Sequence, residues 1–229
     1  KMELDGNVMD DRHLTLSSDS MGSIAITSSM TAGGIGKVGD KVPNAYEEVY
    51  DVTDATDYGL SSQNISSTNQ LGWVSPSYSG LVVTAGITPK SDAGEDSDNS
   101  WAVMYDAGDM VDGLAIGYGQ AENGNTAEAE TVYVTYTTGG LSIGYQDSTY
   151  DVTAATGSDE DSQHLGVSFA VNENLSVSAG RMDVEVGTSA SEEENTGFSA
   201  SYTMGSMTVS GFANKVDNAG GTSGVSKEA

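Results

Sequence analysis

Short segments of alternating side chains recur along this chain, and they constrain its fold more than any other feature. In residues 112–120, Leu114, Ile116 and Tyr118 share one side, while glycine and alanine occupy the other. A period of two indicates β-strands. The pattern predicts about 13 strands, with boundaries uncertain by a few residues. They lie near residues 2–8, 12–17, 23–30, 70–75, 80–88, 100–106, 112–120, 129–137, 140–149, 163–170, 174–184, 195–203 and 207–215.

The connections between these segments alternate between short and long. Tight turns are expected at 18–22, 76–80, 107–112, 138–140, 171–174 and 204–206, and long polar connections at 31–69, 88–100, 121–129, 150–162 and 187–195. Strict alternation places all tight turns at one end of a sheet and all long loops at the other. This is typical of an up-and-down antiparallel meander and excludes a Greek-key sandwich.

A meander of this size would leave long unprotected edges unless it closed into a barrel. The side chains on its apolar face are modest in size, and those on its other face are small or polar. This suits a barrel with lipid outside and water inside. No apolar run approaches the length of a transmembrane helix. We therefore expect an all-β transmembrane barrel.

The charge and the residue types exclude several function classes. The chain of 229 residues has 34 acidic and 8 basic residues, a formal net charge of −26. Such a chain repels polyanions, so nucleic acid is not expected as a partner. It has no cysteine and only two histidines, and it contains no catalytic motif, so we do not expect an enzyme. Most acidic residues fall in the long connections, and the apolar side of the strands is expected to be nearly free of charge.

Three stretches resemble a bacterial general outer-membrane porin of the alphaproteobacterial trimeric type. Residues 12–26 resemble the hairpin before the constriction loop of that family, residues 43–50 resemble the acidic part of the loop, and residues 71–81 resemble the hairpin after it. The resemblance implies a homotrimer in the bacterial outer membrane, in contact with its lipid. It also implies a water-filled channel for passive diffusion of small hydrophilic solutes and ions.

The resemblance also implies a longer barrel than this chain accounts for. The resemblance implies a barrel of 16 strands whose chain ends in an aromatic residue, whereas this chain ends at Ala229. We expect residues 1–229 to form a single barrel domain that lacks terminal strands at both ends. Residues 225–229 are expected to belong to no strand.

The candidate constriction loop is residues 31–69, the longest connection. Long loops of this kind are usually functional. The residues expected at the pore constriction are Asp40, Glu47, Glu48, Asp51 and Asp54. Folded into the lumen, these carboxylates would concentrate cations and repel anions, although an acidic loop can also be a solvated surface loop.

The expected pore wall carries few basic residues. Alternation places His13 with Thr15 and Ser17 in the lumen, and Arg12 with the apolar side unless the end of the strand turns it inward. By the same parity Glu3 and Asp5 face the lumen. A wall so poor in basic groups predicts a cation-preferring pore. Arg181 shares the parity of apolar residues and is expected on the outer rim.

The acidic loops also suggest a calcium hypothesis. Asp92, Glu95, Asp96 and Asp98 crowd one loop, and closely spaced carboxylates suit Ca²⁺. A solvated acidic fringe explains the same residues. The alternative to a porin is therefore a secreted or surface-layer acidic β-rich structural or adhesive protein that calcium stabilises.

Overall fold

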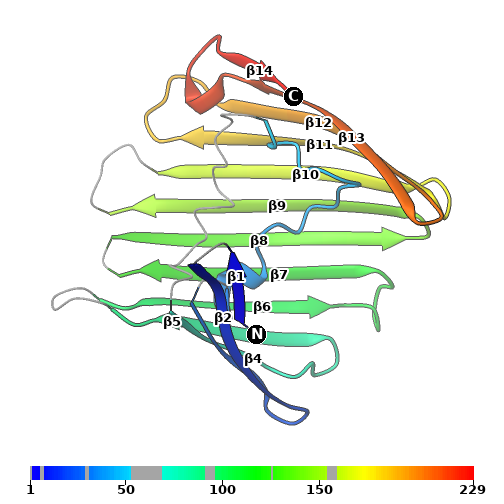
Figure 1. Cartoon of the computed structure of the whole chain (residues 1–229). Coiled ribbons are helices and arrows are strands. Elements are labelled where there is room, and N and C mark those ends of the chain that lie inside the picture. Colours follow the sequence, from blue (N-terminus) through cyan, green and yellow to red (C-terminus); the bar gives the residue numbers. More distant parts are fainter. Residues whose placement is uncertain are drawn as a thin grey trace.

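The chain forms one antiparallel sheet in which each strand pairs with its neighbours in sequence (Figure 1). The structure is a computed structural model, which describes residues 2–5, 8–28, 31–52, 69–90, 96–124, 126–153 and 159–229. Within them the sheet has 14 strands in the order β1 to β14. The strands are β1 (Met2–Asp5), β2 (Val8–Ser18), β3 (Gly22–Thr27), β4 (Gln70–Val74), β5 (Leu81–Thr88), β6 (Asp98–Asp106), β7 (Leu114–Asn123), β8 (Ala127–Thr138), β9 (Leu141–Val152), β10 (Glu160–Ala170), β11 (Leu175–Val186), β12 (Glu193–Met204), β13 (Met207–Asp217) and β14 (Ser226–Glu228).

This topology confirms the meander predicted from the alternating pattern. Each expected strand has a counterpart, and β1 and β14 form the two edges of the described sheet. Two short 3₁₀ helices interrupt the connections, η1 (Gly34–Lys37) and η2 (Ala219–Gly221). In the described ranges, neither helix has the length and apolar character needed to cross a membrane.

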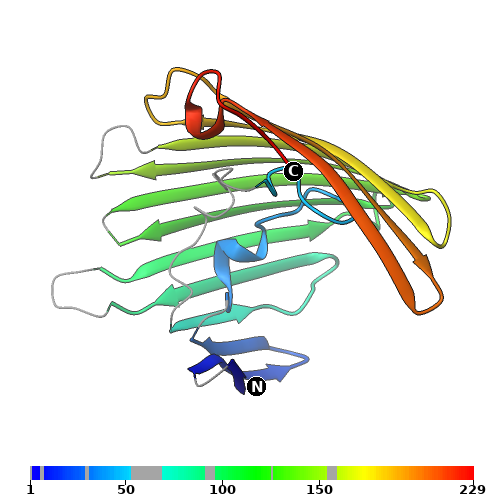
Figure 2. The same cartoon turned by 45° about the horizontal axis from the view of Figure 1, so that its top comes forward.

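The two faces of the sheet differ as the period of two requires. Residues 31–52 pack against one face, which we call the inner face, and Figure 2 shows the sheet curving around this segment. Directly paired residues of neighbouring strands point to the same side of a sheet. The outer face is an apolar band of exposed side chains, among them Leu16 (66% exposed), Leu165 (54%) and Ile143 (42%). The inner face carries mainly glycine, alanine, serine, threonine and amides.

The aromatic side chains on the outer face are partly exposed as well. Trp101 and Tyr118 lie on neighbouring strands with ring centroids 5.5 Å apart. Trp73 donates a hydrogen bond from its indole nitrogen to the Met21 carbonyl, 2.9 Å away, beside the turn between β2 and β3. Such amphipathic rings suit the boundary between lipid and water.

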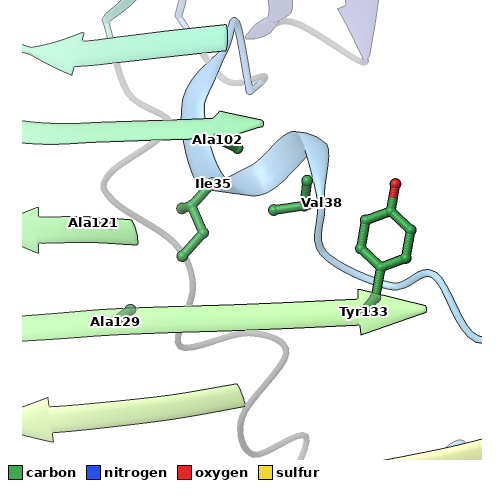
Figure 3. Packing of buried hydrophobic residues seen from close by; sticks show 6 residues of the cluster. All are labelled: Ile35, Val38, Ala102, Ala121, Ala129 and Tyr133. Carbon is green, nitrogen blue, oxygen red and sulfur yellow. The ribbon is translucent and has the colours of Figure 1, made fainter. Parts of the chain in front are cut away.

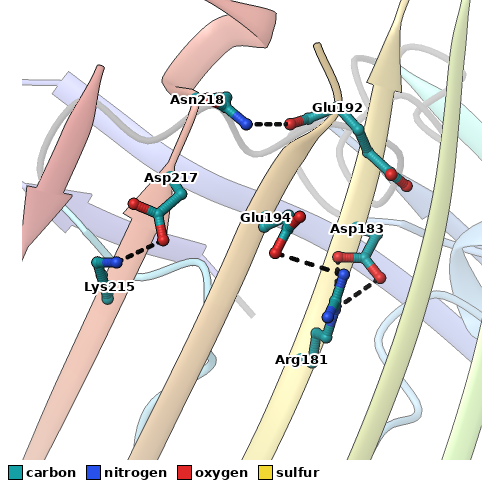
Figure 4. Close-up of polar contacts among 7 residues, drawn as sticks. All are labelled: Arg181, Asp183, Glu192, Glu194, Lys215, Asp217 and Asn218. Atoms are coloured by element: carbon teal, nitrogen blue, oxygen red, sulfur yellow. Dashed lines mark hydrogen bonds and ion pairs between the residues drawn. The ribbon is translucent and has the colours of Figure 1, made fainter. Parts of the chain in front are cut away.

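The expectation that the apolar side of the strands is nearly free of charge is wrong. Several strands continue beyond the apolar band toward the long loops, so carboxylates lie on the outer face of paired strands, among them Asp161 and Glu194, which the sequence pattern places in loops. Asp161 is opposite Glu185, and Asp183 is opposite Glu194. Arg181 lies on this face as predicted, with its guanidinium 2.7 Å from Asp183 and 3.4 Å from Glu194 (Figure 4). The strands continue to pair beyond the apolar band because a fully paired backbone is stable in water as well as in lipid.

Two further expectations about the chain's connections are corrected. The sequence pattern predicts a long connection at residues 121–129, but only residues 124–126 separate β7 from β8. The chain end is not outside the sheet either. In β14, Lys227 pairs with Val216 of β13, and backbone bonds of 3.0 Å join Ala229 and Asn214 in both directions. The alternating pattern is too short in this tail to be recognised from sequence.

A charge placed in the middle of the apolar band tests which face meets lipid. Val134 lies on the outer face of β8, opposite Ile116 and Tyr145. We expect Val134→Arg to lower the free energy of unfolding in lipid vesicles by about 2–4 kcal/mol, because an arginine near the bilayer midplane is poorly solvated.

Thr138→Arg is the matched control for this measurement. It lies on the same face of the same strand, next to the tight turn, and is expected to cost about 0–1 kcal/mol. Equal losses for the two variants would contradict a lipid-facing band.

Candidate channel constriction

Residues 31–52, the docked segment, cross the inner face from β4 to β13. Hydrogen bonds fix the segment at intervals along this path. The amide of Gly34 donates to Thr84 Oγ1 on β5 at 2.9 Å, and the amide of Ala45 donates to Ser178 Oγ on β11 at 2.9 Å. At the far end Asn214 of β13 donates from Nδ2 to the carbonyl of Glu48 at 2.6 Å. The described part of the predicted constriction loop therefore lies inside the curve of the sheet.

Gln146 of β9 holds the middle of the docked segment. Its side chain is 1% exposed. Its Oε1 accepts a hydrogen bond from the Lys41 amide at 2.8 Å, and its Nε2 donates to the Val38 carbonyl at 3.1 Å. A second bond from Nε2 to Thr131 Oγ1, at 3.0 Å, fixes the amide in this orientation.

Apolar side chains bury the remainder of the contact. Ile35 and Val38 of the docked segment are fully buried among four residues of the wall (Figure 3). Val49 packs on Met182 and Val184, and Val52 packs on Val216. The four wall residues of the first cluster are Ala102, Ala121, Ala129 and Tyr133.

A row of glycines in the wall allows the backbone of the docked segment to approach closely. Each lies directly opposite the next across β9 to β12. A Cβ atom at Gly144 would lie 2.4 Å from Pro43 Cδ, and one at Gly166 would lie 2.4 Å from Val42 Cγ1. Side chains there would push the segment away from the wall. The glycine row consists of Gly144, Gly166, Gly180 and Gly197.

Four of the predicted constriction carboxylates come together on the docked segment. Side-chain hydrogen bonds join Glu48 to Asp40 and Glu47 to Asp51. The Asp51 carboxylate also accepts the backbone amide of Glu48 at 3.0 Å, and Asn44 donates to the Glu48 carboxyl group. The structure thus places Asp40, Glu47, Glu48 and Asp51 in one cluster.

Crowding changes the protonation of this cluster. Burial, together with the charges of Asp40 and Asp51, raises the pKa of Glu48 to about 8. The hydrogen bond to Asp51 raises the pKa of Glu47. Desolvation raises the pKa of Asp40, although the Lys41 ammonium group opposes this shift. At neutral pH Glu48 is therefore mostly protonated, and the cluster carries less charge than its formal count.

The predicted wall residues divide between the two faces. His13 pairs with Thr27, which is buried on the inner face, so His13 faces inward. Arg12 has the parity of Leu14, which is 59% exposed on the outer face, and its own side chain is exposed. Glu3 and Asp5 lie in β1, but their side chains are outside what the structure describes. Asp54 is also outside the described residues.

The predicted calcium loop is only partly described. Asp96 and Asp98 are described, whereas Asp92 and Glu95 lie outside the described residues. In the ranges given above, no group of three or more His, Cys, Asp or Glu side chains is arranged to hold a metal ion. Calcium binding by this loop stays a prediction.

Sequence reasoning missed the wall residues that hold the docked segment. Gln146, Ser178, Ser199 and Asn214 are buried and polar, and each has the inward parity of its strand. Their signal in the sequence is a hydrogen-bonding side chain where the pattern otherwise places a small residue. Their partners, however, are backbone groups more than a hundred residues away.

The family comparison agrees with this architecture. A model of the Gram-negative porin family matches residues 5–226. The chain belongs to the Gram-negative porins. It is accordingly a channel protein of the bacterial outer membrane, and the family match favours this interpretation over a secreted adhesive protein.

Solved structures of other outer-membrane proteins share the fold at low sequence identity. OmpT, an outer membrane protein of Vibrio cholerae, matches with a TM-score of 0.66 and 17% identity over 97% of this chain and 76% of that one. An anion-selective porin from Comamonas acidovorans matches at 0.64 and 15%, over 96% and 75%. A variant of the Rh. blastica porin matches at 0.61 and 12%, over 96% and 75%. No curated protein matches this porin by sequence.

Removing the central anchor of the porin's docked segment should loosen it. Gln146→Leu keeps the side-chain size but leaves the Lys41 amide and the Val38 carbonyl without their partner. An unsatisfied buried group costs about 1–3 kcal/mol. We expect noisier single-channel currents and faster proteolysis within residues 31–52.

Gln163→Leu provides the control, because Gln163 is an exposed glutamine of the adjacent strand β10. Its currents should match those of the unaltered porin. If the Gln146 variant shows no more current noise than the unaltered porin, the other hydrogen bonds are enough to hold the docked segment.

The protonation of Glu48 should make ion selectivity depend on pH. Its pKa rises from an ordinary 4.5 to about 8, so the docked segment holds an extra proton between these values. Raising the pH through 8 removes that proton, which adds negative charge and weakens docking. We expect cation preference, measured as a reversal potential in a salt gradient, to increase between pH 7 and pH 9. The increase should be absent in Glu48→Gln, and a variant that keeps it would assign the titration to another group.

Proposed function

We propose that this porin passes small hydrophilic solutes by passive diffusion, catalyses no reaction, and prefers cations to anions. The observation that carries the proposal is the carboxylate cluster on a segment fixed inside the sheet. Charge on the wall of a narrow aqueous passage raises the local concentration of ions of opposite sign. The fold does not decide the sign of selectivity, since the similar Comamonas porin is anion-selective by name. The sign must therefore come from the side chains along the passage.

Basic side chains offset only part of this acidic charge. Lys37 and Lys41 are the lysines of the docked segment, and Lys37 donates to the Thr31 carbonyl at 3.1 Å. Arg181 and Lys215 lie on the outer face, where each contacts a carboxylate. Lys227 has inward parity opposite Val216, at the edge of the sheet. These positions support a passage with an excess of negative charge.

The proposal includes a homotrimer, which the resemblance to trimeric porins implies. It also includes contact of the apolar band with outer-membrane lipid. The exposed apolar residues of the outer face support both, because each contact would remove apolar side chains from water.

The direct test is a planar bilayer containing the purified porin and a KCl gradient. The unaltered channel should show a reversal potential of the sign that K⁺ permeation produces. The triple variant Glu47→Gln, Glu48→Gln, Asp51→Asn should lower the K⁺ to Cl⁻ permeability ratio by about twofold or more, because the cluster no longer attracts K⁺.

A matched control removes three carboxylates from the outer face. Glu128→Gln, Glu130→Gln and Asp151→Asn lie on exposed positions of β8 and β9. This variant should keep its reversal potential. Equal shifts in both variants would indicate a general effect of net charge, and no shift in either would place the cluster outside the conduction path. A protein without conductance would contradict the channel itself.

A further inference from the structure

Two aromatic rings lie together on the inner face, where the wall carries mainly small and polar side chains. Tyr46 belongs to the docked segment and Phe212 to β13, and their ring centroids are 6.2 Å apart with planes tilted by 45°. Phe212 pairs directly with Ser199, whose Oγ accepts the Tyr46 amide at 3.2 Å. Both rings therefore lie on the face that the docked segment covers.

These rings are not part of the packing that holds the docked segment. Tyr46 is 47% exposed and Phe212 is 38% exposed. Neither belongs to the buried clusters formed by Ile35, Val49 and Val52. Exposed aromatic residues on the outer face meet lipid, but these two face the aqueous side of the wall. Apolar surface left exposed there is available to a passing solute.

Negative charge borders the aromatic pair. The Tyr46 hydroxyl donates a hydrogen bond to the Glu47 carboxylate, which in turn is joined to Asp51. An aromatic face attracts a cation through the ring quadrupole, and a nearby carboxylate adds to this attraction. The apolar rings also favour a ligand that carries hydrocarbon, which K⁺ does not. Ring and carboxylate together match an organic ammonium ion.

We propose that Tyr46, Phe212 and Glu47 form a subsite that binds small organic ammonium ions within the channel. The subsite rests on the proposed function, because it requires the inner face to line the passage. It adds a preference among cations to the preference for cations over anions. Binding there slows the organic ion, so that while bound it obstructs the flow of K⁺.

Block of the K⁺ current by choline chloride tests the subsite in planar bilayers. We expect choline to reduce single-channel K⁺ current in a saturable manner. Tyr46→Ser and Phe212→Ser should each raise the half-blocking concentration by about two- to fivefold, the range for one cation–π contact near water. Tyr46→Phe keeps the ring and should retain most of the block. K⁺ conductance and reversal potential confirm that each variant is folded and open.

Two controls separate the parts of the proposal. Tyr118→Ser removes a ring from an aromatic pair on the outer face and should leave block unchanged. The alcohol 3,3-dimethylbutan-1-ol has the shape of choline without its charge and should not block. Equal block by the alcohol, or by glucose in place of choline, would overturn an ammonium subsite.

The outcomes also distinguish this subsite from the function on which it rests. Cation-selective conductance without choline block, or block that survives loss of both rings, contradicts the subsite alone. Absence of conductance contradicts the proposed channel and the subsite with it.

Discussion

The close approach of the docked segment to the wall is the contact on which the rest of this porin's inner architecture depends. A segment of irregular backbone can lie against a sheet only where the wall leaves room and supplies hydrogen-bonding partners. The glycine row supplies the room across β9 to β12, and Gln146 with the inward serines supplies the partners. The carboxylate cluster and the exposed rings are held in place by this docking, since both lie on the docked segment or directly beside it.

Docking also explains why the two faces tolerate different substitutions. The outer face needs only apolar side chains of no particular shape, because lipid adapts to them. The inner face is in contact with a fixed backbone, and one added methyl group at Gly144 would meet Pro43. High glycine content, which in a sequence can indicate flexible or disordered chain, here accompanies a closely packed interface.

Much of the fold could be predicted from the sequence because one period governs each strand. The parity of Leu114, Ile116 and Tyr118 assigns a face without any knowledge of neighbours. The parity argument also placed His13 on the inner face and Arg181 on the outer face. Parity also places Phe212 on the inner face, the side that Ser210 and Asn214 share. The sequence does not reveal that Tyr46 lies beside it.

The features that sequence could not give depend on contacts between distant residues. Glu48 and Asn214 are joined by one hydrogen bond across 166 positions, and no local pattern predicts that bond. The ends of strands were missed for a related reason. Pairing continues wherever a neighbour is available, so β9 and β11 run past the apolar band, and their outward positions there carry acidic residues such as Asp151 and Glu185.

The separation of acidic groups changes the meaning of the net charge of −26. Carboxylates on the outer face lie outside the passage, where water and the guanidinium of Arg181 reduce their effect (Figure 4). Glu48 is partly buried and lies close to the other carboxylates of the cluster, so it keeps its proton at neutral pH. In the proposed channel, the charge that acts on a permeating ion is therefore a small part of the formal total. It is set by the geometry of one docked segment, so a few substitutions there should outweigh many elsewhere.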